Sequence, residues 1–270
     1  MTFFKSLMLS LSLAGLTAFP VAAGEVLNIK PRDGVFLRML IDEVPDGAKD
    51  VVVLFPGGHG RVLVKKDGTF KGTKSNFLTR TRKLFAANGL VTILFDAPSD
   101  HRKGEGMTFA YRMTEEHTGD IKLAIAKVRE RFPGLSVWLM GTSRGSTSAA
   151  NAAANIKDGA PDGVVLTSTI GQATKFGGNV LDFNLAAVTI PVLVFHHNDD
   201  GCMTTPITGA KNIKDALINS KGAEIIIVEG GSSGSGGSGE GRTCGSQSHH
   251  GFLDIEQKVV DAISAWIKSH

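Results

Sequence analysis

Short apolar runs of strand length alternate with segments of helical period along most of this chain. The strand-like runs are continuously apolar rather than alternating, which is typical of parallel strands buried on both faces. The pattern therefore predicts an α/β fold with a mostly parallel central sheet and helices on both faces. The first two runs have no helix between them, which predicts an antiparallel start. We expect strands at 35–41, 50–55, 90–95, 136–140, 163–167, 191–195 and 223–228, and helices at 75–88, 114–132, 145–156, 208–220 and 252–268.

Residues 1–23 have the composition of a secretory signal peptide. A positive start that includes Lys5 is followed by an apolar run at 7–19 and by the small residues Val21-Ala22-Ala23. The apolar run is shorter than the ~20 residues that a membrane-spanning helix needs. We therefore expect cleavage after Ala23, one domain over residues 24–270, no membrane span, and a periplasmic or secreted location.

The charge balance excludes one large class of partner. The chain carries 29 Lys+Arg against 26 Asp+Glu, for a net charge of +3, and 42% of its residues are hydrophobic. A dedicated nucleic-acid binder would show a basic stripe or patch, so no nucleic-acid partner is expected. The apolar content is sufficient for a packed core. The oligomeric state is left open by the sequence.

The chain contains two cysteines, Cys202 and Cys244. An even number of cysteines in an oxidising compartment predicts a disulfide. The alternative is a pair of free thiols.

The motif that points most directly to chemistry is G-x-S-x-G, at Gly141–Gly145. It follows an expected strand and opens an Ala-rich expected helix, so that a tight turn lifts Ser143 above the sheet as a nucleophile. The alternative for Ser143 is a helix-capping role. A second match, at Gly230–Gly234, is followed only by more Gly and Ser and is rejected.

A serine nucleophile needs a base and an orienting carboxylate. His250, in the loop before the last expected helix, is the preferred base, with His249 as the alternative. Asp200 leaves the strand at 191–195 and is the preferred acid, with Asp199 as the alternative. His196 and His197 beside Asp199 also allow a metal-site interpretation, but adjacent histidines rarely converge on one ion. We expect no metal.

The glycine-rich segment at 55–60 follows another strand and has little side-chain bulk. Its backbone N–H groups, at Gly58 and His59, together with the N–H of Arg144, could form an oxyanion hole. A phosphate-binding loop is the alternative, but the Lys-Ser/Thr ending of a P-loop is missing.

The order Ser143, Asp200, His250, with each residue after a strand, resembles the α/β-hydrolase superfamily, and small bacterial enzymes of the dienelactone-hydrolase or prolyl-oligopeptidase-domain kind in particular. The segment His196–Asp200 replaces the glycine of the familiar His-Gly-x-x-Asp form. The resemblance implies an exported serine hydrolase that cleaves a carboxylic ester of a small molecule through an acyl-enzyme, without a cofactor. The alternatives are a peptidase or thioesterase on the same triad, an acyltransferase, or a non-catalytic binding protein.

Two further segments bear on the substrate and the site. Only residues 168–190 are available where many lipases insert a lid, so no large lid domain is expected. The segment 97–118, together with Arg144, could cover the site and favour an acidic or polar acyl group, or the segment could be a solvated loop. Its polar and basic residues are Asp100, His101, Arg102, Lys103, Tyr111, Arg112 and His117. A disulfide between Cys202 and Cys244 would limit the freedom that the Gly/Ser-rich stretch at 230–241 gives the base loop.

Overall fold

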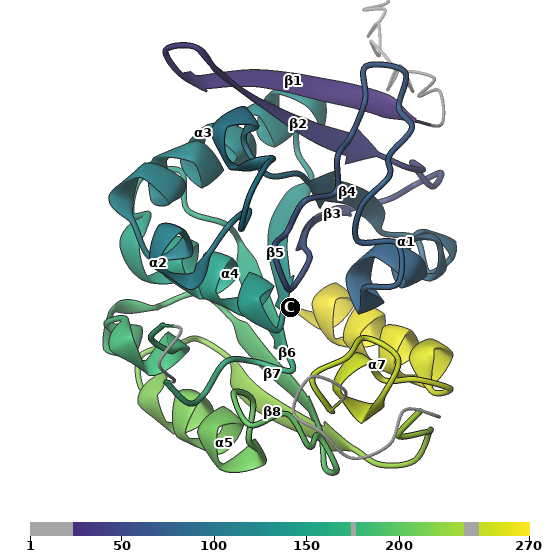
Figure 1. Cartoon of the computed structure of the whole chain (residues 1–270), viewed down its shortest axis with the longest axis vertical. Coiled ribbons are helices and arrows are strands. Elements are labelled where there is room, and N and C mark those ends of the chain that lie inside the picture. Colours follow the sequence, from purple (N-terminus) through teal and green to yellow (C-terminus); the bar gives the residue numbers. More distant parts are fainter. Residues whose placement is uncertain (1–23, 174–176, 235–242) are drawn as a thin grey trace, which may run out of the picture.

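A computed structural model describes residues 24–173, 177–234 and 243–270. The expected signal peptide and most of the Gly/Ser-rich stretch lie outside these residues. The described chain forms one eight-stranded sheet in the order β1-β2-β4-β3-β5-β6-β7-β8, with helices on both faces (Figure 1). The strands are β1 (Glu25–Arg32), β2 (Val35–Ile41), β3 (Asp50–Phe55), β4 (Val91–Phe95), β5 (Ser136–Thr142), β6 (Gly163–Thr167), β7 (Val192–His197) and β8 (Ala223–Val228).

The pairing confirms a mostly parallel sheet with an antiparallel start, although the two runs from which that start was predicted, 35–41 and 50–55, are not neighbours in the sheet. Strands β3 to β8 are parallel, whereas β1 pairs antiparallel with β2, and β2 antiparallel with β4. The sequence-based interpretation did not include β1. This edge strand mixes polar with apolar residues, so it lacks a continuous apolar run. Leu27 is its only buried residue, and Val26 and Ile29 are half-buried.

The helices are α1 (Phe77–Ala87), α2 (Phe109–Arg112), α3 (Glu115–Arg131), α4 (Arg144–Asn155), α5 (Ile207–Ala216) and α7 (Glu256–Ser269). Helices α1 and α7 cover one face of the sheet, and α3, α4 and α5 cover the other (Figure 1). Consecutive residues of β3 enter different cores, with Val53 facing the α3–α5 side and Leu54 the α1–α7 side. This two-sided burial explains why the strand is apolar throughout.

Local signals set the ends of several helices. The Asn76 side chain accepts a hydrogen bond from the N–H of Leu78 at the start of α1, and the Thr114 side chain does the same for His117 in α3. Helix α7 begins later than the expected residue 252. Phe252 and Asp254 adopt positive φ angles of 58° and 66°, which interrupt a right-handed helix.

Strand β7 extends two residues beyond its expected end. His196 and His197 pair with Ile227 and Val228 of β8, so that both histidines belong to the sheet. The connection from β6 to β7 contains two short 3-10 turns, at Val180–Asp182 and Leu185–Ala187, among its described residues. No helix in the described part of the chain is long and apolar enough to cross a membrane.

Candidate active site

Ser143 lies at the turn between β5 and α4 in a strained backbone conformation. Its φ of 52° and ψ of −128° fall in a region that non-glycine residues rarely adopt. The close approach of the surrounding chain requires the motif's glycines, since a Cβ on Gly145 would overlap the carbonyl oxygen of Phe55, and one on Gly141 would overlap that of Gly145. The turn thus packs directly against the end of β3.

The strained turn is held by hydrogen bonds that the sequence motif does not reveal. The Ser143 N–H donates to the Thr167 carbonyl at 3.1 Å, which joins the turn to the end of β6. The Ser146 hydroxyl donates to the Ser143 carbonyl at 2.6 Å and accepts from the N–H of Ile170 at 3.1 Å. Ser146 is therefore a positioning residue for this turn.

Asp200 and His250 lie together at the carboxyl edge of the sheet. His250 Nδ1 is 3.0 Å from Asp200 Oδ2, and both side chains are almost fully buried. Asp200 also accepts hydrogen bonds from the Cys202 N–H at 3.0 Å and the Thr205 hydroxyl at 2.8 Å. With Nδ1 donating to the carboxylate, Nε2 of the imidazole remains available as a proton acceptor.

Opposing effects act on the Asp200 carboxyl. Burial pushes its pKa upward, but the charge and hydrogen bond of His250, with further support from His196 and the Cys202 N–H, outweigh burial. The pKa of Asp200 is therefore lowered, and the side chain is a carboxylate at neutral pH.

Sequence reasoning missed Thr205, whose hydroxyl also lies 3.2 Å from His250 Nδ1.

The backbone around His250 is fixed from several sides. The Ser168 hydroxyl donates to the His250 carbonyl at 2.7 Å, and the Ser248 hydroxyl accepts from the His250 N–H at 3.2 Å. Arg80 donates to the carbonyl of the adjacent Gly251. Donors from distant segments, the Ser168 hydroxyl and the Arg80 guanidinium, thus fix the loop of His250. The sequence of the loop itself does not predict these contacts.

The predicted disulfide is confirmed, because Cys202 and Cys244 are bonded. Cys202 follows Asp200 by two positions, and Cys244 precedes His250 by six. The bond therefore joins the loop of the carboxylate to the loop of the imidazole, beside the residues 235–242 that the structure does not describe.

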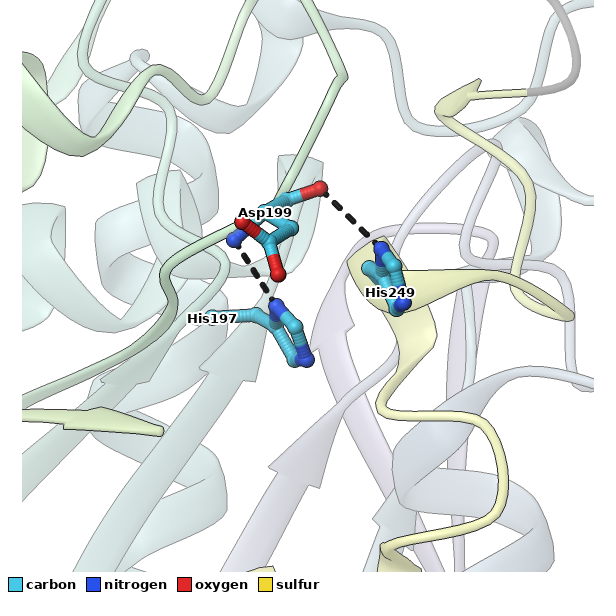
Figure 2. A group of neighbouring side chains, drawn as sticks. All are labelled: His197, Asp199 and His249. Atoms are coloured by element: carbon cyan, nitrogen blue, oxygen red, sulfur yellow. Dashed lines mark hydrogen bonds between the residues drawn. The ribbon is translucent and has the colours of Figure 1, made fainter. Parts of the chain in front are cut away.

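The alternative residues Asp199 and His249 form a separate group with His197 (Figure 2). The Asp199 N–H donates to His197 Nδ1 at 2.9 Å, and His249 Nδ1 lies 3.3 Å from the Asp199 carbonyl oxygen. The two imidazoles are stacked, with centroids 4.4 Å apart and planes 10° apart. The structure therefore places Asp199 and His249 beside each other rather than with Asp200 and His250.

The donor set of this group suits a cation only in part. His197 Nε2 lies 2.7 Å from the Gly230 carbonyl oxygen, so both of its ring nitrogens are already engaged. A histidine binds a metal ion through a nitrogen lone pair that lies in the plane of its ring. Because the His197 and His249 rings are nearly parallel, their lone pairs do not point to one common position. His196, the other histidine of the metal-site interpretation, is buried apart from the group, and its Nε2 lies 3.8 Å from Asp200.

Two cavities meet at Ser143. The smaller, of about 210 Å³, is lined by His250 and by polar residues of the segment 73–76. The larger, of about 780 Å³, is lined by Arg61, Phe109 and Arg144 among others. Gly58, His59 and Cys244 line both cavities. Among the described residues, the Ser143 hydroxyl has no hydrogen-bond partner, which leaves it available to a ligand in either cavity.

The residues expected to form the oxyanion hole also converge here. A Cβ on Gly57 would lie 2.9 Å from the Cβ of Ser143, so the glycine-rich loop passes directly beside the serine. Within the described part of the chain, no hydrogen bond uses the N–H of Gly58, His59 or Arg144. These three donors are free for a ligand oxygen.

The segment 97–118 fits neither sequence-based interpretation over its whole length. Part of it is buried, including Tyr111, Arg112 and His117, while residues 103–105 are exposed. Arg102 is paired with Asp96, and Asp100 with Arg32. Only residues 104, 105 and 108–110 of this segment line the larger cavity. Apolar and polar residues alternate too irregularly there for burial to be recognised from the sequence.

No protein-family model matches this sequence, and no curated protein sequence is significantly similar to it. Solved structures do resemble it. An esterase of Pyrococcus furiosus aligns over 91% of both chains with a TM-score of 0.61 at 11% identity. A second, Thermogutta terrifontis esterase 2, solved after phosphoramylation by tabun, aligns over 93% of this chain and 96% of its own, with a TM-score of 0.59 at 16% identity.

A third similar structure is a lidless α/β serine hydrolase of Xanthomonas campestris. It aligns over 92% of this chain and 96% of its own, with a TM-score of 0.56 at 14% identity. These similarities extend over nearly the whole described chain and agree with the order and direction of its strands. The protein has the α/β-hydrolase fold.

Proposed function

We propose that this protein is a serine hydrolase that cleaves carboxylic esters through an acyl-enzyme on Ser143, with His250 as base and Asp200 as its orienting carboxylate. The observation that carries the proposal is the buried 3.0 Å contact between Asp200 and His250 at the cavity that Ser143 lines. A strained serine between a strand and a helix, beside an imidazole with a free Nε2, suits nucleophilic catalysis.

In the first half of the reaction, the Ser143 hydroxyl attacks the ester carbonyl carbon while His250 Nε2 takes the hydroxyl proton. The carbonyl oxygen becomes an oxyanion, which the N–H groups of Gly58, His59 and Arg144 stabilise. When the tetrahedral intermediate collapses, the bond to the alcohol oxygen breaks and His250 returns the proton to the leaving alkoxide. The acyl group remains on Ser143.

In the second half, water replaces the alcohol. His250 Nε2 takes a proton from water, the hydroxide oxygen attacks the acyl carbon, and the bond to the Ser143 oxygen breaks. The proton passes to Ser143, and the carboxylic acid leaves. Throughout, Asp200 holds the imidazole in one orientation and stabilises its protonated form. The residues of the chain suffice for these steps.

Covalent labelling with a fluorophosphonate probe tests the nucleophile. We expect the wild-type protein to be labelled and Ser143→Ala to be unlabelled. Ser232→Ala, which removes the serine of the second G-x-S-x-G match, is the matched control and should label normally. Labelling that persists in Ser143→Ala would show that the nucleophile lies elsewhere.

Substrate class and the role of the acid need separate measurements. We expect p-nitrophenyl esters of short acids to be hydrolysed faster than matched thioesters and p-nitroanilides. Asp200→Asn should lower kcat by about 10⁴-fold, as loss of the orienting carboxylate does in serine proteases. Asp199→Asn is the matched control. A larger loss in Asp199→Asn than in Asp200→Asn would contradict the assignment of the acid.

We further propose that the chain is exported and cleaved after Ala23 to give a single domain over residues 24–270. The Cys202–Cys244 disulfide supports an oxidising compartment. Expression of the full chain in a bacterial host, followed by osmotic shock and intact-mass measurement, tests this. The released protein should begin at Gly24, and a mass that retains residues 1–23 would contradict the proposal.

A further inference from the structure

The larger cavity beside Ser143 is unusual in its charge. Its lining includes two arginines, Arg61 and Arg144, and one acidic residue, Glu105. Arg144 directly follows the serine, and its guanidinium carbon lies 5.8 Å from the centre of the Phe109 ring. Glu105 is exposed, so water screens its charge more effectively than the charge of the half-buried arginines.

Neither arginine of this cavity has an acidic partner in the described part of the chain. Among the residues that the structure describes, no carboxylate lies within ion-pair distance of Arg61 or Arg144. The Nε of Arg61 is buried and has no hydrogen-bond partner. Most other arginines in the described chain do pair with carboxylates: Arg32, Arg80, Arg82, Arg102, Arg129 and Arg131.

A third unpaired arginine lies behind the cavity wall. Arg112 is fully buried and donates to the Pro56 carbonyl at 3.1 Å and to the Ser148 hydroxyl at 2.6 Å. A Cβ on Gly60, between His59 and Arg61, would overlap its guanidinium. In a poorly hydrated interior, its charge reaches the cavity with little screening.

The titration of His59 is consistent with a positive potential in the cavity. Burial lowers the pKa of His59, and repulsion from Arg61, Arg112 and Arg144 lowers it further. The imidazole is therefore neutral at pH 7 and does not add to the positive charge. Among the residues that the structure describes here, two lining arginines and the buried Arg112 stand against one solvent-exposed glutamate.

The smaller cavity contrasts with the larger one. Its lining consists of glycines, hydroxyl residues, Asn76, Phe77 and Cys244 besides His59 and His250, with no arginine, lysine or carboxylate. An ester bound at Ser143 would thus place one of its two parts in a small neutral pocket and the other in a larger cationic one.

We infer that the larger cavity is a subsite for a carboxylate carried by the substrate, so that the esters cleaved are anionic ones. This inference rests on the proposed function and specifies the substrate class of the same site. Arg61 supplies the donors for the carboxylate, and Arg144, in the lining of the same cavity, adds a second positive charge. The uncharged part of the ester occupies the smaller cavity.

Paired substrates of equal length test the inference by kinetics. Mono-p-nitrophenyl adipate is compared with p-nitrophenyl hexanoate for a charge on the acyl side, and 4-acetoxybenzoate with its methyl ester for a charge on the alcohol side. We expect one anionic member to exceed its neutral partner in kcat/KM by about tenfold, the effect of one charge-assisted hydrogen bond. The favoured pair reveals which part of the ester enters the larger cavity.

Charge-changing variants assign the effect to residues. In Arg61→Gln, the ratio of anionic to neutral kcat/KM should fall about tenfold. In Glu105→Gln, the ratio should rise. Lys66→Gln, which removes one positive charge from an exposed position outside the cavity, is the matched control. Equal ratios in Arg61→Gln and Lys66→Gln, or a preference for the neutral member of both pairs, would overturn the inference.

A binding measurement separates this inference from the proposed chemistry. Calorimetric titration of Ser143→Ala with adipate should detect binding that the Arg61→Gln substitution weakens, whereas neutral adipamide should bind more weakly than adipate. Such binding together with failure of the fluorophosphonate probe would contradict the hydrolase alone. Labelling of Ser143 without any advantage of adipate over adipamide would contradict the anionic subsite alone.

Discussion

Cys202 and Cys244 form a disulfide across a separation of 42 residues. On the chain-entropy account, closing a loop of this length stabilises the folded state by at most about 4 kcal/mol. The bond also fixes Asp200 relative to His250, because each lies a few residues from one of the cysteines.

We expect the double variant Cys202→Ser/Cys244→Ser to lose up to about 4 kcal/mol of unfolding free energy and to show a lower kcat. Urea unfolding and ester hydrolysis measure the two effects. Dithiothreitol should reproduce both losses in the wild-type protein and change nothing in the double variant. A variant as stable and active as the wild type would contradict this role.

Arg112 is a buried cation without a carboxylate partner among the described residues. Burial and repulsion from Arg144 lower its pKa to about 9, so it stays charged at neutral pH. Replacement by Met leaves the carbonyls of Pro56 and Met107 without their donor. The expected loss of unfolding free energy is about 3 kcal/mol or more.

Because Pro56 begins the loop beside Ser143, Arg112→Met should also lower kcat for a neutral ester more than it changes KM. Arg112→Lys, which keeps the charge, should recover part of the activity. Arg129→Met is the matched control, because Arg129 pairs with Asp162 near the surface and should cost less than about 1 kcal/mol. Equal destabilisation by Arg112→Met and Arg129→Met would show that the buried contacts contribute little.

Gly145 and Gly119 are glycines in helices with opposite surroundings. A Cβ on Gly145 would overlap the Phe55 carbonyl oxygen, whereas one on Gly119 would meet nothing within 4 Å. We expect Gly145→Ala to destabilise the protein by about 3 kcal/mol and to abolish labelling of Ser143. Gly119→Ala should stabilise it by about 1 kcal/mol through helix propensity. Thermal and urea unfolding test the contrast, which similar effects of the two substitutions would contradict.

His117 should make the protein less stable in mild acid. Burial lowers its pKa well below the usual value, with repulsion from Arg112 adding to the effect. The unfolded chain protonates this histidine near pH 6.5 while the folded protein does not, so stability falls as pH decreases below about 6.5. The dependence is about 1.4 kcal/mol per pH unit for each such group.

In His117→Gln, the unfolding free energy should therefore decrease less steeply between pH 6.5 and 4.5 than in the wild type. His59 and His196, whose pKa values are also lowered by burial, remain in both proteins and cancel in the comparison. Urea unfolding at a series of pH values measures the slopes. Identical slopes would show that His117 becomes protonated in the folded protein.

Much of the fold followed from the sequence because the strands of a parallel sheet are buried on both faces. The apolar runs at 50–55 and 163–167 correspond to β3 and β6 without a shift. The edge strand β1 was missed, since the exposed residues Asn28 and Lys30 interrupt its apolar run. The late start of α7 was missed because the sequence pattern does not signal positive φ angles at Phe252 and Asp254.

For the candidate site, the sequence by itself determined the chemical types and their order along the chain: a serine in a glycine-flanked turn, then carboxylates, then histidines. Only the tertiary structure decided which members meet. Asp200 lies against His250 while Asp199 lies beside His249, because adjacent residues direct their side chains differently. Tertiary packing likewise decided which arginines lie at the larger cavity without a described carboxylate partner. The sequence alone does not show which charged side chains form ion pairs.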